Sequence, residues 1–147
     1  MSDSELITLY SGRILALAAD IPHLGRLAAP SGSVRKRAPL CGSTVTVDLV
    51  MRDGRVAAFA QEVKSCALGQ AAAAVLGQAV LGRSRAELDT ARAGLTAMLK
   101  AAGPVPAAPF QGYEVLLPAR DYKNRHASIL LAIEAACEAA AQSADGV

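Results

Sequence analysis

The stretch from Thr44 to Val63 constrains the fold most strongly, because it has the pattern of two strands joined by a tight turn. Between Thr44 and Arg52, apolar Val, Leu and Met residues alternate with polar residues, which is the two-residue period of a half-buried strand. Asp53-Gly54 supplies a hairpin turn, and residues 55–63 are strand-like with weaker alternation. With an extended segment around residues 33–40, the sequence predicts an antiparallel meander of two or three strands.

Helical spacing of apolar residues flanks this meander. It predicts a first helix from Ser4 to about Asp20 and, with Ser65 as its cap, a second from Cys66 to about Leu81. The sequence Ser84-Arg85-Ala86-Glu87 is a capping box that opens a third helix ending near Lys100, and residues 124–142 form a last amphipathic helix. Aromatic residues make up only 3% of the chain, so we expect a core of Ala, Leu, Val and Ile in closely packed helices.

The chain length and one proline-rich stretch indicate the domain organisation. With 147 residues and 52% hydrophobic composition, residues 1–147 have the size of a single domain. Residues 101–113 contain Pro104, Pro106 and Pro109, so this stretch is not helical. We interpret it as an insertion on the surface rather than as a domain boundary.

Charge and hydropathy exclude several functional classes. A formal net charge of +2 is too small to indicate a nucleic-acid-binding protein. The local basic cluster Arg35-Lys36-Arg37 is typical of a solvated segment, and its functional interpretation is a docking surface for an acidic partner. The first residues lack the pattern of a signal peptide, and the most apolar stretch, residues 67–81, is shorter than the roughly 20 residues that span a bilayer. We therefore expect a cytoplasmic protein that does not bind membranes.

Three cysteines, an odd number, favour thiol or metal chemistry over a disulfide framework. Cys41 precedes Gly42 at the junction of an extended segment and a strand, where the backbone can approach a ligand closely. Cys66 lies at the predicted start of a helix, where backbone N–H groups favour a thiolate. His126 also lies at a helix start, and neutral imidazole is an ordinary ligand for zinc or iron.

Taken alone, each of these residues more often has a structural role, because none has the close CxxC or HxxxH spacing of a strong metal motif. Cysteine is a common buried residue, and a histidine near a helix start is often a capping or surface residue. Cys137 lies about 16 Å along its helix from His126, at roughly 1.5 Å per residue, so we assign it to the core. His23, in a loop with Pro and Gly, is expected to face solvent.

Three segments nevertheless carry a family resemblance in their order along the chain. They are Ala38-Pro39-Leu40-Cys41-Gly42 before a strand, Val63-Lys64-Ser65-Cys66-Ala67 at a helix start, and Leu117-Pro118-Ala119-Arg120 shortly before Arg125-His126-Ala127-Ser128. The chain resembles the NifU-like N-terminal scaffold domain, a family that includes IscU and especially SufU. The insertion at residues 101–113 is similar to that of SufU, and the chaperone-recognition motif of IscU is absent. The resemblance implies an α+β fold with a small antiparallel three-stranded sheet packed against about four helices.

The resemblance also implies a site in which three ligands meet, with two departures. His126 stands where the family has its third cysteine, and Ser43 stands where the family usually has an aspartate. Two thiolates and one imidazole suit zinc or iron, and they leave a fourth tetrahedral position for Ser43, water, sulfide or a partner's thiolate. We therefore expect Cys41, Cys66 and His126 to be the ligands, with Ser43 close to the metal but not firmly bound.

The function implied by the family is that of an iron–sulfur cluster assembly scaffold. The chain would receive sulfur from a cysteine desulfurase and bind a [2Fe–2S] cluster or iron for recipient apo iron–sulfur proteins. The alternative is a SufU-like zinc-bound sulfur acceptor, in which Cys41 or Cys66 takes a persulfide, so that the chain is at most a zinc-dependent sulfurtransferase. Two further hypotheses are a zinc hydrolase, which the absence of an HxE signature disfavours, and a degenerate metal-free interaction module.

Overall fold

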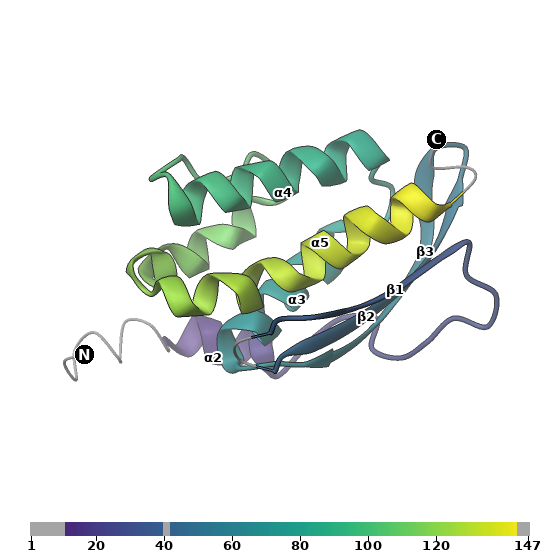
Figure 1. The fold of residues 1–147 in the computed structure, drawn as a ribbon. Coiled ribbons are helices and arrows are strands. Elements are labelled where there is room, and N and C mark those ends of the chain that lie inside the picture. The colour runs from purple at the N-terminus through teal and green to yellow at the C-terminus, as the bar shows by residue number, and fades with distance from the viewer. Residues whose placement is uncertain (1–10, 40–41, 144–147) are drawn as a thin grey trace.

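Figure 1 shows the chain as a computed structural model that describes residues 11–39 and 42–143. Its strands, β1 (Gly32–Arg37), β2 (Thr44–Arg52) and β3 (Arg55–Lys64), form an antiparallel sheet in the order β1–β2–β3. The described helices are α2 (Gly12–Ala18), α3 (Ala67–Ala79), α4 (Arg85–Lys100) and α5 (His126–Gln142), with two 3₁₀ helices, η1 (Gln111–Asp121) and η2 (Lys123–Arg125). This is the α+β class with the three-stranded sheet that the resemblance implied.

The hairpin of β2 and β3 forms where the sequence predicts it. Thr44 pairs with Lys64 at one end and Arg52 pairs with Arg55 at the other. Asp53 and Gly54 both have positive φ, which the tightest hairpin turns require at their two central residues. The predicted extended segment upstream becomes β1, which pairs with the other edge of β2.

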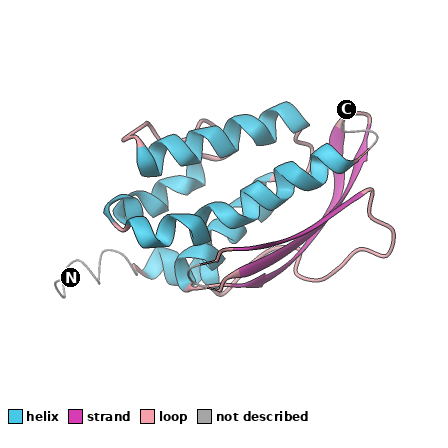
Figure 2. Cartoon of the chain, in the orientation of Figure 1, coloured by secondary structure: helices cyan, strands magenta, loops and turns pink. Residues whose placement is uncertain are grey.

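The helices cover one face of the sheet. Helix α5 packs against β1 and β2, and α3 lies beside it (Figures 1 and 2). The sheet buries four apolar side chains against these helices, each at most 1% exposed: Val45, Val47, Leu49 and Met51. Alanines 71–74 of α3 are equally buried, so small side chains let α3 and α5 approach closely. The expected core of small aliphatic residues is confirmed.

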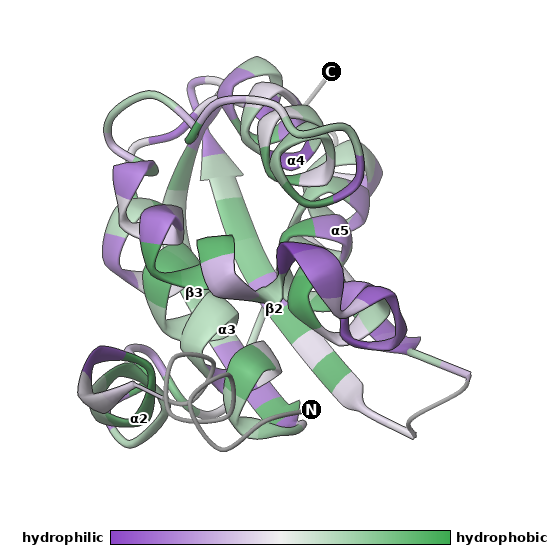
Figure 3. Ribbon diagram, turned by 90° about the vertical axis from the view of Figure 1, so that its left-hand side faces the viewer, coloured by the Kyte–Doolittle hydropathy of each residue, from purple (hydrophilic) through white to green (hydrophobic). Residues whose placement is uncertain are grey.

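Helix α4 forms an outer layer over α5. The predicted capping box is present, because Ser84 Oγ accepts the Glu87 N–H at 3.1 Å and the Glu87 carboxylate accepts the Ser84 N–H at 3.1 Å. In Figure 3 the hydrophobic colour runs along the sheet and α3 in the interior, and hydrophilic stretches lie on α4 and α5. Within the described residues, no helix is long and apolar enough to cross a membrane.

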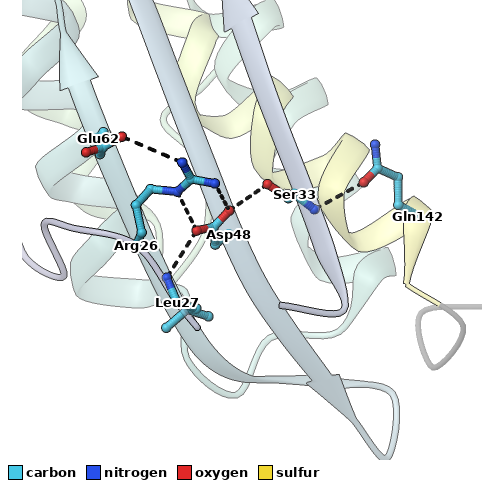
Figure 4. A network of polar contacts seen from close by, with 6 residues as sticks. All are labelled: Arg26, Leu27, Ser33, Asp48, Glu62 and Gln142. Atoms are coloured by element: carbon cyan, nitrogen blue, oxygen red, sulfur yellow. Dashed lines mark hydrogen bonds and ion pairs between the residues drawn. The ribbon is translucent and has the colours of Figure 1, made fainter. Parts of the chain in front are cut away.

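The residues from Pro22 to Ser31 cover part of the other face of the sheet. They are held by Asp48 of β2, whose carboxylate accepts from the Arg26 guanidinium, the Leu27 N–H and the Ser33 hydroxyl (Figure 4). Burial raises the pKa of Asp48, but these hydrogen bonds and the charge of Arg26 lower it more, so its pKa lies below the ordinary 3.8. An ionised carboxylate is thus kept inside the fold by its donors.

Three local predictions are wrong or incomplete. The uninterrupted helix predicted from Ser4 to Asp20 is wrong at Ser11, which has extended backbone and caps α2; residues 4–10 lie outside the described residues. Ser65 is not the cap of α3, because Cys66 itself holds that position. The sequence did not predict η1, whose 3₁₀ period and internal Pro118 give no 3.6-residue pattern.

Candidate metal centre

Two of the segments that carry predicted ligands adjoin the sheet at one end, and the third begins α5. At this end Arg37, Thr44 and Lys64 lie side by side on neighbouring strands. Cys41 belongs to the connection between β1 and β2 and is one of the residues outside the described part of the chain. Cys66 follows β3 and caps α3, and His126 is the first residue of α5. All three ligand segments therefore come from junctions between elements.

Three serine hydroxyls join these segments, and we call Ser43, Ser65 and Ser128 the serine cluster. Ser65 Oγ donates to Ser43 Oγ at 3.1 Å, and Ser43 Oγ lies 3.1 Å from Ser128 Oγ. Ser43 and Ser128 are buried, with exposed fractions of 4% and 2%. Each serine lies within two residues of a predicted ligand in the sequence, so the cluster brings the neighbours of all three ligands together.

Gly69 of α3 makes this close approach possible. A Cβ at this position would collide with Ser65 Oγ, and it would lie 3.1 Å from the backbone oxygen of Ser128. The glycine is buried inside a helix, where it costs stability relative to alanine, so its place is explained by the packing of the cluster.

His126 is 4% exposed, and its ring orientation is fixed by backbone carbonyls of η1. Nε2 lies 3.1 Å from the Ala119 oxygen and 2.9 Å from the Arg120 oxygen. A carbonyl only accepts hydrogen bonds, so Nε2 carries the proton and the lone pair of the neutral ring is on Nδ1. A histidine that donates one N–H to a carbonyl while presenting the other nitrogen is the usual arrangement of a metal ligand.

Cys66 is a half-buried free thiol at the N-cap of α3. Its carbonyl accepts the Gln70 N–H at 2.9 Å, and the Gln70 side chain donates to the Ser65 oxygen at 3.0 Å. The backbone around the thiol is therefore held by the first turn of the helix, while the side chain keeps access to solvent.

The two residues assigned to other roles are placed as expected. His23 is exposed, and its ring makes an edge contact with Phe59. Cys137 is 7% exposed, and burial, together with the nearby Asp89 carboxylate, raises its pKa to about 12. Within residues 11–39 and 42–143, no three His, Cys, Asp or Glu side chains group as a metal site, and Cys41 is not among those residues.

Sequence reasoning missed Ser65 and Ser128 as members of the site. Their contacts with Ser43 span 22 and 85 positions of sequence, so the fold had to be known first. The available signal was that each candidate ligand has a serine one or two positions away.

Comparison with known proteins gives a result from solved structures only. No family model matches the chain, and no curated protein matches it either. Among solved structures, the N-terminal part of a nitrogen-fixing NifU-like protein from Brucella abortus is 44% identical, with a TM-score of 0.92. That match covers 94% of this chain and 96% of the other. This chain belongs to the NifU-like family.

Two further structures support the NifU-like fold at lower identity. A hypothetical protein is 20% identical with a TM-score of 0.81, and the match covers 90% of this chain and 97% of the other. A protein from Fervidobacterium islandicum AW-1, assigned as an iron–sulfur cluster assembly scaffold of the SUF system, is 17% identical with a TM-score of 0.78. This match covers 88% of the present chain and 94% of the other. At identities of 20% and 17%, both matches show a shared fold and nothing more.

Proposed function

We propose that this NifU-like chain is a scaffold for iron–sulfur cluster assembly, with Cys41, Cys66 and His126 as the ligands of a [2Fe–2S] cluster or its iron. The chain would receive sulfur from a cysteine desulfurase and pass the cluster to recipient apo iron–sulfur proteins. We place this chemistry in the cytoplasm, where thiols stay reduced. We also propose that residues 1–147 form one domain, because the described elements share one hydrophobic core.

The serine cluster is the observation that carries the proposal. Ser43, Ser65 and Ser128 are joined by hydroxyl contacts of 3.1 Å, and they adjoin Cys41, Cys66 and His126 in the sequence. Segments that are far apart along the chain are thereby held at one end of the sheet. The orientation of His126 adds independent support, because its Nε2–H donates to two backbone carbonyls and the lone pair is on Nδ1.

Sulfur transfer to this site follows ordinary persulfide chemistry. A thiolate of Cys41 or Cys66 attacks the terminal sulfur of the persulfide on the desulfurase, a new S–S bond forms on the scaffold, and the desulfurase cysteine leaves as a thiolate. Conversion of the bound sulfur to sulfide takes two electrons per sulfur from an external thiol or a protein reductant. The half-buried Cys66, at an element junction, has the access that this attack needs.

The imidazole ligand sets how firmly the cluster is held. Replacement of thiolate by neutral histidine removes a negative charge from the cluster and raises its potential, as in Rieske centres. Ser43 contributes no charge either, because its hydroxyl is engaged with two other hydroxyls. A ligand set with low negative charge suits a scaffold that releases its cluster to another protein.

Zinc is the second candidate for the same ligands. Two thiolates, one imidazole and one open tetrahedral position are a set that zinc accepts. In that case Cys41, Cys66 and His126 would hold the zinc, which would keep the thiols ionised, and the thiolate of Cys41 or Cys66 would take the terminal sulfur of the desulfurase persulfide. The neutral Nδ1 of His126 favours this candidate as much as it favours iron.

Anaerobic reconstitution separates the two candidates. The purified protein is incubated with iron, a cysteine desulfurase, cysteine and dithiothreitol, and iron, zinc and sulfide are measured per chain. The variants are Cys41→Ala, Cys66→Ala and His126→Ala, with Cys137→Ala as the matched control, since Cys137 lies in the core. Equal iron and sulfide, lost in the first three variants and kept in the control, are the expected result.

Other outcomes point to the remaining hypotheses. Zinc alone, with persulfide on Cys41 or Cys66 by mass spectrometry, makes the chain a zinc-bound sulfur acceptor. Absence of any bound metal from the wild-type protein would contradict both candidates and leave a metal-free interaction module. Hydrolysis that depends on added zinc would favour a hydrolase.

A further inference from the structure

The basic cluster Arg35-Lys36-Arg37 is divided between two faces of the sheet. Lys36 turns to the helical side, where its ammonium lies 2.8 Å from the Glu138 carboxylate of α5. The hydrogen bond to Glu138 raises the pKa of Lys36 above its ordinary value. Arg35 and Arg37 are exposed and alternate with Lys36 along β1, so they project from the opposite, open face. Lys36 thus has a structural role, which the two arginines do not share.

Lys64 joins the two arginines on the open face. Arg37 pairs with Thr44, and Thr44 pairs with Lys64, so the three side chains stand in one row across the sheet and on one side of it. Arg35 stands in the next row, opposite Thr46. Lys64 is exposed, and in the part of the chain that the structure describes no ion pair involves Arg35, Arg37 or Lys64.

This face of the sheet is hollowed beside Arg35 and Lys64. A hollow of about 420 Å³ lies between Arg35 and Lys64 and is also lined by Thr44 and Thr46 of β2. Its other end is closed by Arg26, whose charge is engaged by Asp48 and lies 4.0 Å from Glu62. Figure 4 views the same face, with Arg26 and Glu62 in front and the helices behind the strands. Three basic side chains, Arg26, Arg35 and Lys64, and one carboxylate, Glu62, therefore line the hollow.

The position of the row relative to the candidate metal centre gives it a role. Arg37 ends β1 immediately before the connection that contains Cys41, and Lys64 ends β3 two positions before Cys66. A partner bound to this row would lie near Cys66, which is one of the two cysteines proposed to take up sulfur. Unpaired charges at the rim of an interface mainly accelerate association and orient the partner.

We propose that Arg35, Arg37 and Lys64 form the docking surface for an acidic face of the cysteine desulfurase that supplies sulfur to this site. This inference rests on the proposed scaffold function and adds the surface and the charge of the partner. Charge on edge strands also protects sheets from aggregation, but that role would not depend on which end of the sheet carries it.

Charge reversal at matched positions tests the docking surface. The variants are Arg37→Glu and Lys64→Glu, and the control is Arg52→Glu, which changes the charge equally at an exposed position at the far end of β2. Binding to each cysteine desulfurase of the source organism is measured at low and at raised salt. We expect about tenfold weaker binding in the first two variants, mainly through slower association. The control should bind as the wild-type protein does. Raised salt should weaken wild-type binding and narrow these differences.

A second assay separates this inference from the scaffold function. Cluster assembly from iron and free sulfide needs no desulfurase, so Arg37→Glu and Lys64→Glu should assemble the cluster normally there and slowly when the desulfurase supplies sulfur. If both variants match Arg52→Glu in binding and in desulfurase-dependent assembly, the docking surface is wrong and the scaffold function stands. If the wild-type protein takes up no cluster or metal from free components, the scaffold function itself is wrong. If the wild-type protein assembles from sulfide but binds no desulfurase, the docking inference is overturned.

Discussion

The Asp48 network and the serine cluster both attach distant segments to β2, but they use different chemistry. Asp48 is a buried carboxylate with donors from Arg26, the Leu27 backbone and Ser33. The serine cluster consists of neutral hydroxyls, and it joins residues that adjoin the candidate ligands in the sequence. One strand thus carries a charged anchor in its middle and an uncharged anchor at its end.

The difference follows from what each place must accommodate. A buried charge is stable only when hydrogen-bond donors surround it. The donors around Asp48 therefore fix one geometry of its carboxylate and leave no room for a ligand. Hydroxyls hold the neighbouring segments with little electrostatic cost, and they add no negative charge to the proposed metal site. The family resemblance implies an aspartate where this chain has Ser43, so under the proposed function this site carries one negative charge fewer.

Removal of the charged anchor should have the largest effect on stability. Asp48→Ala leaves the Leu27 N–H and the Ser33 hydroxyl without their acceptor, so we expect a loss of about 2 to 4 kcal/mol in the free energy of unfolding. Urea unfolding measures this loss. The matched control is Glu62→Ala, which removes an exposed carboxylate near the same arginine and should cost at most about 0.5 kcal/mol. Equal losses in both variants would contradict the structural role of Asp48.

The same carboxylate predicts a pH dependence. The pKa of Asp48 in the folded chain lies below the ordinary 3.8, so its contribution is fully present above pH 3.8 and is lost as the pH falls through the folded value. The stability gap between wild type and Asp48→Ala should therefore be constant near neutral pH and shrink in acid below pH 3.8. Unfolding curves at several pH values test this prediction. A stability gap that widens in acid would contradict a lowered pKa of Asp48 in the folded chain.

Two helical glycines should respond with opposite sign to the same substitution. A Cβ at Gly69 collides with Ser65, so Gly69→Ala should destabilise the fold by about 1 to 3 kcal/mol and separate Ser65 from Ser43. A Cβ at Gly94 of α4 would lie 3.5 Å from the nearest Pro106 atom, an ordinary contact, so Gly94→Ala should stabilise by up to about 1 kcal/mol. Thermal unfolding of both variants compares them directly. Stabilisation by Gly69→Ala would show that the serine cluster does not limit this packing.

Ser43→Ala should have the smallest effect on stability and is the most informative about chemistry. It removes contacts to Ser65 and Ser128, at a cost of about 1 kcal/mol. Metal affinity should be unchanged, because Ser43 is an anchor and not a ligand. Competition with a chromophoric zinc chelator measures that affinity. A large loss of affinity with unchanged stability would make Ser43 a ligand and remove the contrast between the two anchors.

Those parts of the fold that depend on local sequence pattern could be predicted from the sequence. Alternation from Thr44 to Arg52, the Asp53-Gly54 turn and the capping box at Ser84 each carry a local physical signal, and each is present in the structure. The break at Ser11 and the 3₁₀ helix η1 were missed, because apolar periodicity reports neither a cap within a helical pattern nor a three-residue turn.

The candidate site was predictable only in its ligand types. Residue chemistry and order indicated Cys41, Cys66 and His126, and these assignments stay predictions. The serine cluster and the carbonyls that orient His126 depend on packing between segments, which no local pattern encodes. The burial of Asp48 was equally hidden, because the alternation of β2 groups it with the polar residues that face away from the helices.

The central claim, that His126 presents Nδ1 to a metal at the serine-linked end of the sheet, is tested most directly by side-chain nitrogen NMR. The sequence has two histidines, so ¹⁵N-labelled histidine gives two ring systems, assigned with a His23→Ala variant. We predict that His126 is protonated on Nε2 in the metal-free protein, and that stoichiometric zinc shifts the resonance of its Nδ1 while the resonances of His23 are unchanged. A proton on Nδ1 of His126, or a His126 ring that does not respond to zinc, would contradict it.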